Sequence, residues 1–314
     1  MRKLVLIFAF LAAPNPFIFA ETVSLNHTKF TNLPYVGPGP LRLAASGEGG
    51  NYFLSQPATP GAPWNLTTPN GPKAVPIPAN MPVAMGDQHL VWVERSPLDT
   101  TLRYCVLPSC DHYQAERAEL RGILTMKPIG PYVFTIHKDA MGIFLSRIEL
   151  TSGKVTKLES LPEDQFAYRF GQCSTERIVL VDPSALRYKV FTPNQPSSSS
   201  YWTELRSDLA DALKAKKPDF QTFGTAKVVP MHVRAHWLSA EGTDVFLLAK
   251  SQKGVGLYAI EVDGDGREAK RYLLRWPEGK SVNLSATFDL VTTNGDQVSF
   301  YMSGGAEATF RGLL

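Results

Sequence analysis

The sequence has few cysteines, almost no excess charge and only one long apolar run. After that run, which lies at the start, no second apolar segment is long enough to suggest a membrane span. The 32 basic and 29 acidic residues nearly balance, so the net charge gives no electrostatic reason to expect binding to nucleic acid or to anionic membranes. Because 44% of the residues are hydrophobic, the chain can bury a core, and the composition excludes an intrinsically disordered protein.

Residues 1–20 have the three parts of a secretory signal peptide. Arg2 and Lys3 are basic, an apolar run follows over residues 4–13, and the small residue Ala20 precedes Glu21. A membrane anchor needs about 20 apolar residues, so we expect cleavage after residue 20, although an uncleaved anchor is the alternative. The mature chain, residues 21–314, would then be a single secreted or periplasmic domain with 30 basic and 29 acidic residues, a formal net charge of +1.

The three cysteines are Cys105, Cys110 and Cys173. In an exported protein the close pair Cys105 and Cys110 is best interpreted as a disulfide across a turn. Free thiols are one alternative; a metal site is another, but His112 is the only further ligand nearby. Cys173 is expected to be a small buried residue.

Short β-type segments at regular spacing dominate the rest of the chain. Runs of five to eight apolar and aromatic residues alternate with Gly, Pro, Asn, Asp and Ser, and in groups of four they repeat about every 40 residues, as in a propeller. The best-defined groups lie at 82–85, 89–94, 102–107 and 118–123; at 132–136, 142–150 and 155–161; at 166–170, 177–181 and 186–191; and at 232–238, 245–249, 257–262 and 269–276.

The two ends of the mature chain complement each other. A loose first group lies at 41–45, 51–54, 64–67 and 73–77, whereas the last group has only three strands, at 285–291, 297–302 and 308–314. The segment 22–30 can supply the missing fourth strand. The sequence therefore predicts an all-β, six-bladed propeller closed by an N-terminal strand, which leaves no long unpaired sheet edge.

One group carries a resemblance to a known kind of protein. The segment Met85–Trp92 (MGDQHLVW), followed by Leu102–Cys105 (LRYC), resembles the unit of secreted bacterial β-propeller repeat proteins, and residues 182–188 match that unit in part. The resemblance implies the fold. Functions within that group are varied, so it implies no activity.

One segment departs from the strand pattern. Residues 201–217 predict a helical insertion because four apolar residues, Trp202, Leu205, Leu209 and Leu213, follow at spacings of three, four and four. Acidic residues come early in the segment and lysines late, as the helix dipole favours. We expect this helix to pack across one propeller face, and its apolar residues are candidate contacts for a partner.

Patterns that suggest chemistry are incomplete. His232 and His236 would lie about 13 Å apart on a strand, too far for one metal ion. The loop beginning at Asp263 has Leu274 where a calcium loop needs glutamate, so it predicts a hairpin turn. A Gly-x-Ser-x-Gly elbow and a Gly-rich phosphate loop are both missing. We therefore predict no metal and no cofactor. The polar candidates for the propeller channel are Asp87, His137, Asp139, His232, Arg234 and Asp289.

The leading functional hypothesis is a binding or scaffolding module for a protein or a small ligand on one propeller face. A hydrolase or lyase acting on a sugar or lactone is the first alternative, and a subunit of a cell-envelope assembly is the second. An enzyme should bring several Asp, Glu, His or Asn side chains together in the channel, whereas a protein-binding module should expose an apolar patch. A nucleic-acid partner is not expected.

Overall fold

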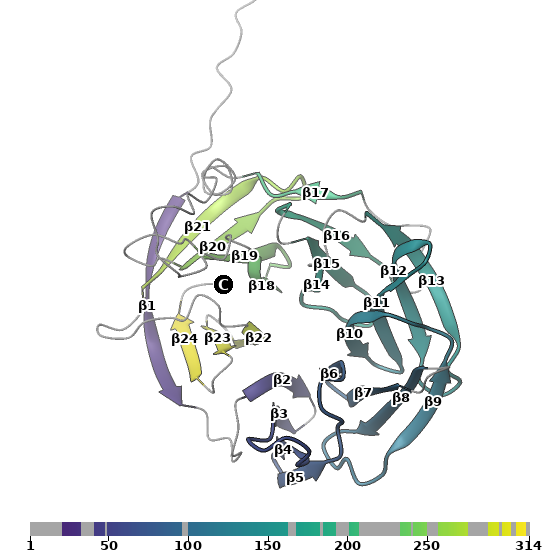
Figure 1. The fold of residues 1–314 in the computed structure, drawn as a ribbon. Coiled ribbons are helices and arrows are strands. Elements are labelled where there is room, and N and C mark those ends of the chain that lie inside the picture. Colours follow the sequence, from purple (N-terminus) through teal and green to yellow (C-terminus); the bar gives the residue numbers. More distant parts are fainter. Residues whose placement is uncertain are drawn as a thin grey trace, which may run out of the picture.

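The structure is a ring of β-sheets. It is a computed structural model and describes residues 21–32, 41–47, 49–95, 100–162, 168–182, 185–192, 201–206, 233–239, 241–249, 257–275, 288–294, 297–302 and 306–311. These residues form 24 strands and no helix, so no described segment is a helix that could cross a membrane. Figure 1 shows the strands arranged around a central space, with the inner strand of each group facing it. The architecture is an all-β propeller, as predicted.

Four sheets have four antiparallel strands each, in chain order from the inside outward. The first two are β2 (Leu41–Gly47), β3 (Gly50–Ser55), β4 (Trp64–Thr68) and β5 (Gly71–Val75), then β6 (Val83–Met85), β7 (His89–Arg95), β8 (Thr100–Val106) and β9 (Gln114–Ala118). The next two are β10 (Ile123–Ile129), β11 (Tyr132–Asp139), β12 (Gly142–Glu149) and β13 (Val155–Leu161), then β14 (Arg169–Phe170), β15 (Ile178–Asp182), β16 (Arg187–Phe191) and β17 (Thr203–Glu204).

The fifth sheet has eight strands in the order β18-β19-β20-β21-β1-β24-β23-β22. Its members are β1 (Glu21–Asn32), β18 (Val233–Leu238), β19 (Asp244–Ala249), β20 (Leu257–Val262), β21 (Glu268–Arg275), β22 (Phe288–Asn294), β23 (Gln297–Met302) and β24 (Ala306–Arg311). Strand β1 lies at its centre and joins the two strand groups that the sequence assigns to separate blades.

The N-terminal strand closes the ring, but the predicted number of blades is wrong. The described residues form five hydrogen-bonded sheets, not six. The reason is the length of β1: Glu21–Asn26 pairs in parallel with β21, and the segment from His27 to Asn32 pairs antiparallel with β24. The predicted pairing of residues 22–30 with the last strands is thus observed in the second half of β1. Its first half adds a pairing that the sequence did not indicate.

The core is divided among the seams between neighbouring sheets. Each of four buried apolar clusters draws its residues from two consecutive sheets, so the sheets pack face to face around the ring. A fifth, smaller cluster joins Leu41 and Phe53 of the first sheet to Tyr301 of β23. Asn51 also donates a hydrogen bond to the Tyr301 hydroxyl at 2.9 Å. The first and last sheets are therefore in contact.

The predicted strand at 118–123 is wrong. Strand β9 ends at Ala118 and β10 begins at Ile123, so this segment connects two sheets. The reason is Gly122, which has a φ of 64° and whose carbonyl accepts a hydrogen bond from the Lys138 amide at 3.0 Å. A residue in the left-handed region interrupts the extended backbone that a strand requires.

The predicted helix at 201–217 is wrong over the residues that the structure describes. Thr203 and Glu204 form β17 and pair with Tyr188 and Arg187 of β16. Without this strand β16 would leave its backbone groups unpaired at the sheet edge, so tertiary pairing overrides the local periodicity. Positions 207–217, which include Leu209 and Leu213, lie outside the described residues.

The two predicted partner contacts in the described part of this segment face the core. Leu205 is 1% exposed and belongs to the cluster between the β14–β17 sheet and β18–β20. Trp202 packs against Tyr168, with ring centroids 5.8 Å apart, and beneath the Arg187 guanidinium at 4.8 Å. Leu205 is thus buried and Trp202 is half-buried, and the contact of this segment with a partner stays a prediction.

Candidate functional site

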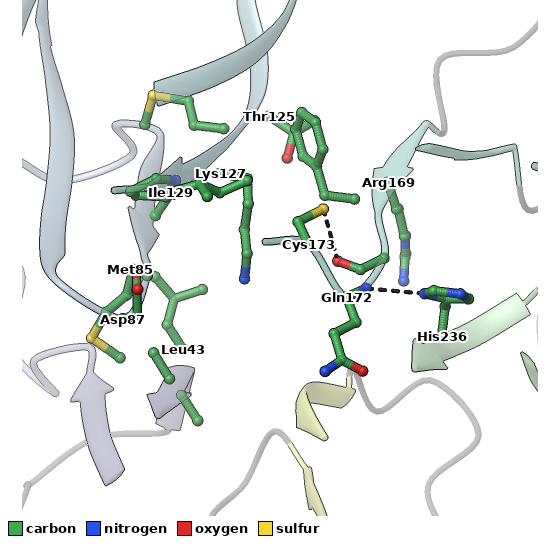
Figure 2. Close-up of a pocket in the computed structure, with 18 of the residues that line it drawn as sticks. Leu43, Met85, Asp87, Thr125, Lys127, Ile129, Arg169, Gln172, Cys173 and His236 are labelled. Carbon is green, nitrogen blue, oxygen red and sulfur yellow. Dashed lines mark hydrogen bonds between the residues drawn. The ribbon is translucent and has the colours of Figure 1, made fainter. Parts of the chain in front are cut away.

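The inner strands surround a cavity of about 630 Å³ at the centre of the ring, which we call the hub. Figure 2 shows the residues that line it, from β2, β6, β10, the segment that begins with β14, and β18. The first residues of consecutive strands in this set are 40 to 64 positions apart along the chain, and the propeller brings the strands together. The hub is therefore built by the whole fold and not by one loop.

Glycines let neighbouring sheets approach closely around the hub. Gly47 ends the inner strand β2, and Gly86 and Gly171 directly follow β6 and β14. A Cβ atom on any of these glycines would collide with the next sheet. The obstacles are the Asp87 carbonyl for Gly47, the Pro128 carbonyl for Gly86, and the His236 ring, at 2.5 Å, for Gly171. A larger residue at these positions would have to push the sheets apart.

His236 is the most buried titratable group of the hub wall, and both of its ring nitrogens are hydrogen-bonded. Nδ1 accepts a hydrogen bond from the Gln172 amide at 3.1 Å, and Nε2 lies 2.8 Å from Oδ1 of Asp244. A backbone amide can only donate, so Nδ1 carries no proton and Nε2 donates to Asp244. Arg177 completes the network by donating to both oxygens of the same carboxylate, at 2.7 and 2.9 Å.

The network keeps its histidine neutral and its aspartate ionised. Burial lowers the pKa of His236 below its ordinary value of 6.5, although the Asp244 carboxylate opposes this shift. Burial raises the pKa of Asp244, but hydrogen bonds from His236 and Arg177 outweigh it, so the net shift is downward. At neutral pH the site is a neutral imidazole beside a carboxylate that is paired with a guanidinium.

Cys173, the cysteine outside the disulfide, lies in the hub wall as a hydrogen-bonded thiol. Its Sγ donates to the Gly171 carbonyl at 3.3 Å and accepts from the Val179 amide at 3.4 Å. Burial raises the pKa of the thiol, and the charge of Lys127 only partly opposes this shift. The side chain is therefore protonated at neutral pH, and it is half-buried rather than fully buried as predicted.

Of the predicted channel residues, Asp87 lies in the hub and two others do not. His137 and Asp139 line a separate cavity of about 390 Å³, together with Thr100 and Arg117 of the preceding sheet. His137 is buried, its Nε2 lies 3.0 Å from Oγ of Ser146, and burial lowers its pKa. Their placement in the channel is thus wrong, because β11 is the second strand of its sheet and β10 is the inner one.

The remaining channel candidates are only partly described. Arg234 lies in β18 and Asp289 in β22, and both strands are inner strands, as Figure 1 shows. The structure describes the backbone of these two residues. His232 lies outside the described residues.

No group of three or more His, Cys, Asp or Glu side chains in the described part of the chain is arranged to hold a metal ion. Asp263–Gly266 is a hairpin turn between β20 and β21, as predicted. The Gly266 amide donates to the Asp263 carbonyl at 2.9 Å, and the Asp263 carboxylate accepts from the Asp265 and Arg267 amides. That carboxylate stabilises the turn.

The predicted disulfide between Cys105 and Cys110 is confirmed, with a Cα–Cα distance of 4.9 Å. Both cysteines are buried in the cluster between the first two sheets. The loop that they close contains a cis peptide bond between Leu107 and Pro108. The disulfide thus lies at a seam of the propeller, away from the hub.

The sequence patterns did not predict the network of Arg177, Asp244 and His236 or the close contacts of the hub glycines. The three network residues are separated by up to 67 positions. They come together only because β18 pairs with β19 and these strands pack against the β14–β17 sheet. A glycine directly after several of the inner strands was a visible signal, and alignment of the repeat units would have found it.

No protein-family model matches the chain, and no curated protein matches its sequence. Among solved structures, a catalytically inactive virginiamycin B lyase from Staphylococcus aureus matches over 90% of this chain and 98% of its own, with a TM-score of 0.49 and 9% identity. TolB from Acinetobacter baumannii matches over 89% and 67%, with a TM-score of 0.42 and 12% identity.

A prolyl endopeptidase structure matches over 83% of this chain but only 37% of its own, with a TM-score of 0.46 and 12% identity. At these identities and TM-scores, the three likenesses carry no inference about activity or ligand.

Proposed function

We propose that this protein is a binding module whose small ligand enters the hub. The observation that carries the proposal is the cavity of about 630 Å³ lined by inner strands of all five sheets. Small-molecule sites in proteins are concave and typically have volumes of about 300–1,000 Å³. The hub wall combines apolar residues such as Leu43 and Ile129 with polar ones such as Thr125 and Gln172.

The state of two hub residues favours binding over covalent chemistry. A nucleophile needs a deprotonated or activated side chain, and a general base needs a free lone pair directed at the substrate. Cys173 is a protonated thiol that donates to Gly171, and His236 uses both ring nitrogens within the wall. These two groups are thus engaged in holding the hub together.

We further propose that the module acts outside the cytoplasm. The support comes from the signal-like segment at residues 1–20, which lies outside the described residues, and from the disulfide between Cys105 and Cys110. Structural disulfides persist mainly in oxidising compartments.

A thermal-shift screen of small molecules against the purified protein tests the hub as the binding site. A ligand of the folded state at about 100 times its dissociation constant stabilises that state by about 2.7 kcal/mol, which is visible as a higher melting temperature. We expect hits that Ser46→Trp abolishes, because Ser46 is an exposed residue of the hub wall and an indole there would project into the cavity and obstruct it.

The matched control is Asn70→Trp, which places the same side chain on an exposed turn between β4 and β5. This variant should keep every hit. Hits that persist in Ser46→Trp would contradict the proposal, and turnover of a sugar or lactone at the hub would favour the hydrolase or lyase alternative.

A further inference from the structure

Two cationic side chains of the hub have no partner in the described part of the chain. Lys127 of β10 and Arg169 of β14 line the cavity, and neither makes an ion pair or hydrogen bond with a described residue. Other cations of the described residues, by contrast, pair closely with carboxylates, as Lys189 does with Glu159 at 2.6 Å and Arg187 with Asp182 at 3.0 Å. In Figure 2 the two cationic side chains extend in the same direction, on either side of Cys173.

Gln172 adds a donor of fixed orientation between them. Its Oε1 accepts a hydrogen bond from the Leu238 amide at 2.9 Å, which assigns the oxygen because a backbone amide can only donate. The Nε2 amino group of Gln172 is therefore left to donate, and Figure 2 shows the side chain projecting on the side toward which Lys127 and Arg169 extend. Three side chains of the wall thus offer hydrogen-bond donors.

Little negative charge opposes the two cations. Asp87 is the only carboxylate among the described residues that line the hub, and Figure 2 places it on the far side of Lys127 from Arg169. The Cys173 thiol and the His236 ring are neutral at neutral pH, since burial raises the pKa of the first and lowers that of the second. The described wall between β10 and β14 is therefore positive and rich in donors.

We infer that the ligand of the hub carries an anionic group, a carboxylate or a phosphate, that binds between Lys127, Arg169 and Nε2 of Gln172. A guanidinium presents two parallel N–H groups that match the oxygens of either anion, and an ammonium adds a point charge. This inference rests on the proposed binding function and specifies the chemistry of its ligand.

Isothermal titration calorimetry at low ionic strength tests the inference with three probes: inorganic phosphate, succinate, and succinamide as a neutral analogue of succinate. We expect the wild-type protein to bind at least one of the anions and to bind succinamide much more weakly. Lys127→Gln and Arg169→Gln should each weaken binding of that anion by about tenfold, and the double variant should abolish it, because a charge-assisted hydrogen bond contributes about this much.

The matched control is Arg103→Gln, which removes a cation that pairs with Glu94 at 2.7 Å outside the hub. Binding should change less than about twofold. Preference for phosphate over succinate would indicate a phosphate-bearing ligand, and the reverse a carboxylate. Equal binding by the double variant and the wild type, or no anion binding at millimolar concentration, would overturn the inference.

Ser46→Trp separates failure of the inference from failure of the proposed function. If succinamide binds as tightly as succinate, and Ser46→Trp abolishes the binding of both, the hub is a binding site and only its preference for anions is wrong. If Ser46→Trp binds every probe like the wild type, the probes bind elsewhere, and both the inference and the proposed function are wrong.

Discussion

Two seams of the propeller hold neighbouring sheets together by different means. Between the β2–β5 and β6–β9 sheets, a large apolar cluster includes both cysteines of the disulfide loop. The polar contacts of this seam lie near the surface: Lys73 bonds to the Ser109 carbonyl at 2.7 Å and pairs with Asp111, whose side chain is 61% exposed.

The seam between the β14–β17 sheet and strands β18–β20 also has an apolar cluster, in which the rings of Tyr188 and Phe246 lie 4.8 Å apart. Its polar contacts, however, are withdrawn from solvent. The Asp244 side chain is 13% exposed and that of His236 only 1%. One seam is thus reinforced by a local covalent bond, and the other by a desolvated charge network.

This difference predicts different weaknesses. A protein with a buried charge network is destabilised when one member is removed or changes its charge, because the remaining members stay buried without a partner of opposite charge or a hydrogen bond. A protein with a local disulfide is destabilised when that bond is reduced. The contribution of the bond to the free energy of unfolding is limited by the small loop that it closes. The first seam should therefore respond to reductant and the second to acid.

The largest effect is expected from Asp244→Ala. This change leaves the Arg177 guanidinium and the Nε2 proton of His236 without their acceptor, so the free energy of unfolding should fall by about 3 kcal/mol. Urea unfolding followed by tryptophan fluorescence measures it. Glu94→Ala, which breaks an exposed pair with Arg103, is the control and should cost less than about 1 kcal/mol. Equal losses in the two variants would show that burial of the network is not what matters.

The next largest effect is expected from the double variant Cys105→Ala, Cys110→Ala. Loss of a disulfide with a sequence separation of five should lower the free energy of unfolding by about 2 kcal/mol through the added freedom of the unfolded chain. Unfolding in urea with and without reductant measures it. Reductant should destabilise the wild type and Cys173→Ala but leave the double variant unchanged. A reductant effect that persists in the double variant would place the redox-sensitive group elsewhere.

These two seams also mark what the sequence could predict. The disulfide was predictable because both cysteines lie in one turn of an exported chain. Strand positions such as 155–161, which β13 reproduces, were predictable from the alternation of apolar runs and turn residues. The network of His236, Asp244 and Arg177 was not, because it depends on the register of β18 with β19 and on how their sheet packs against the β14–β17 sheet.

Errors arose where a long-range pairing outweighed a local pattern. Residues 201–206 have helical spacing, yet the unpaired edge of β16 takes up Thr203 and Glu204 as a strand. The blade count failed because β1 pairs on both of its edges, which composition and periodicity do not reveal. For the hub, the sequence yielded Asp87 but not Lys127, Arg169 or Gln172. Only the fold shows that Lys127 and Arg169 make no ion pair with a described residue and that Gln172 lies beside them in the wall.

A smaller effect is expected from pH. The folded-state pKa of His236 is below 6.5, so between that pKa and 6.5 the unfolded chain binds a proton that the folded chain does not. The contribution of the neutral His236 to the free energy of unfolding is fully present above about pH 6.5. It is lost as the pH falls, by at most about 1.4 kcal/mol per pH unit. Asp244 adds no pH dependence of stability in this range, because its pKa is lowered and its contribution is lost only near and below pH 3.8.

His236→Asn tests this contribution, because asparagine does not titrate. Urea unfolding between about pH 7.5 and about pH 5.5 should show a smaller loss of stability for the variant than for the wild type. Some slope should remain, since burial also lowers the pKa of His89 and His137. Cys105→Ala, Cys110→Ala should keep the full wild-type slope. Parallel pH profiles for His236→Asn and the wild type would mean that the seam between β14–β17 and β18–β20 is not acid-sensitive.

The smallest effect is expected from Lys73→Met. This change removes a charge pair from the seam between the β2–β5 and β6–β9 sheets, whose stability we expect to come from its apolar cluster and the disulfide. The Lys73 ammonium is attracted to Asp111 near the surface, where solvent already stabilises both charges. The methionine keeps the apolar part of the side chain, so the urea midpoint should move less than for Glu94→Ala, with or without added salt. If Lys73→Met instead destabilised the protein as strongly as Asp244→Ala, surface charge would matter as much as buried charge, and the two seams would not differ in the way their burial suggests.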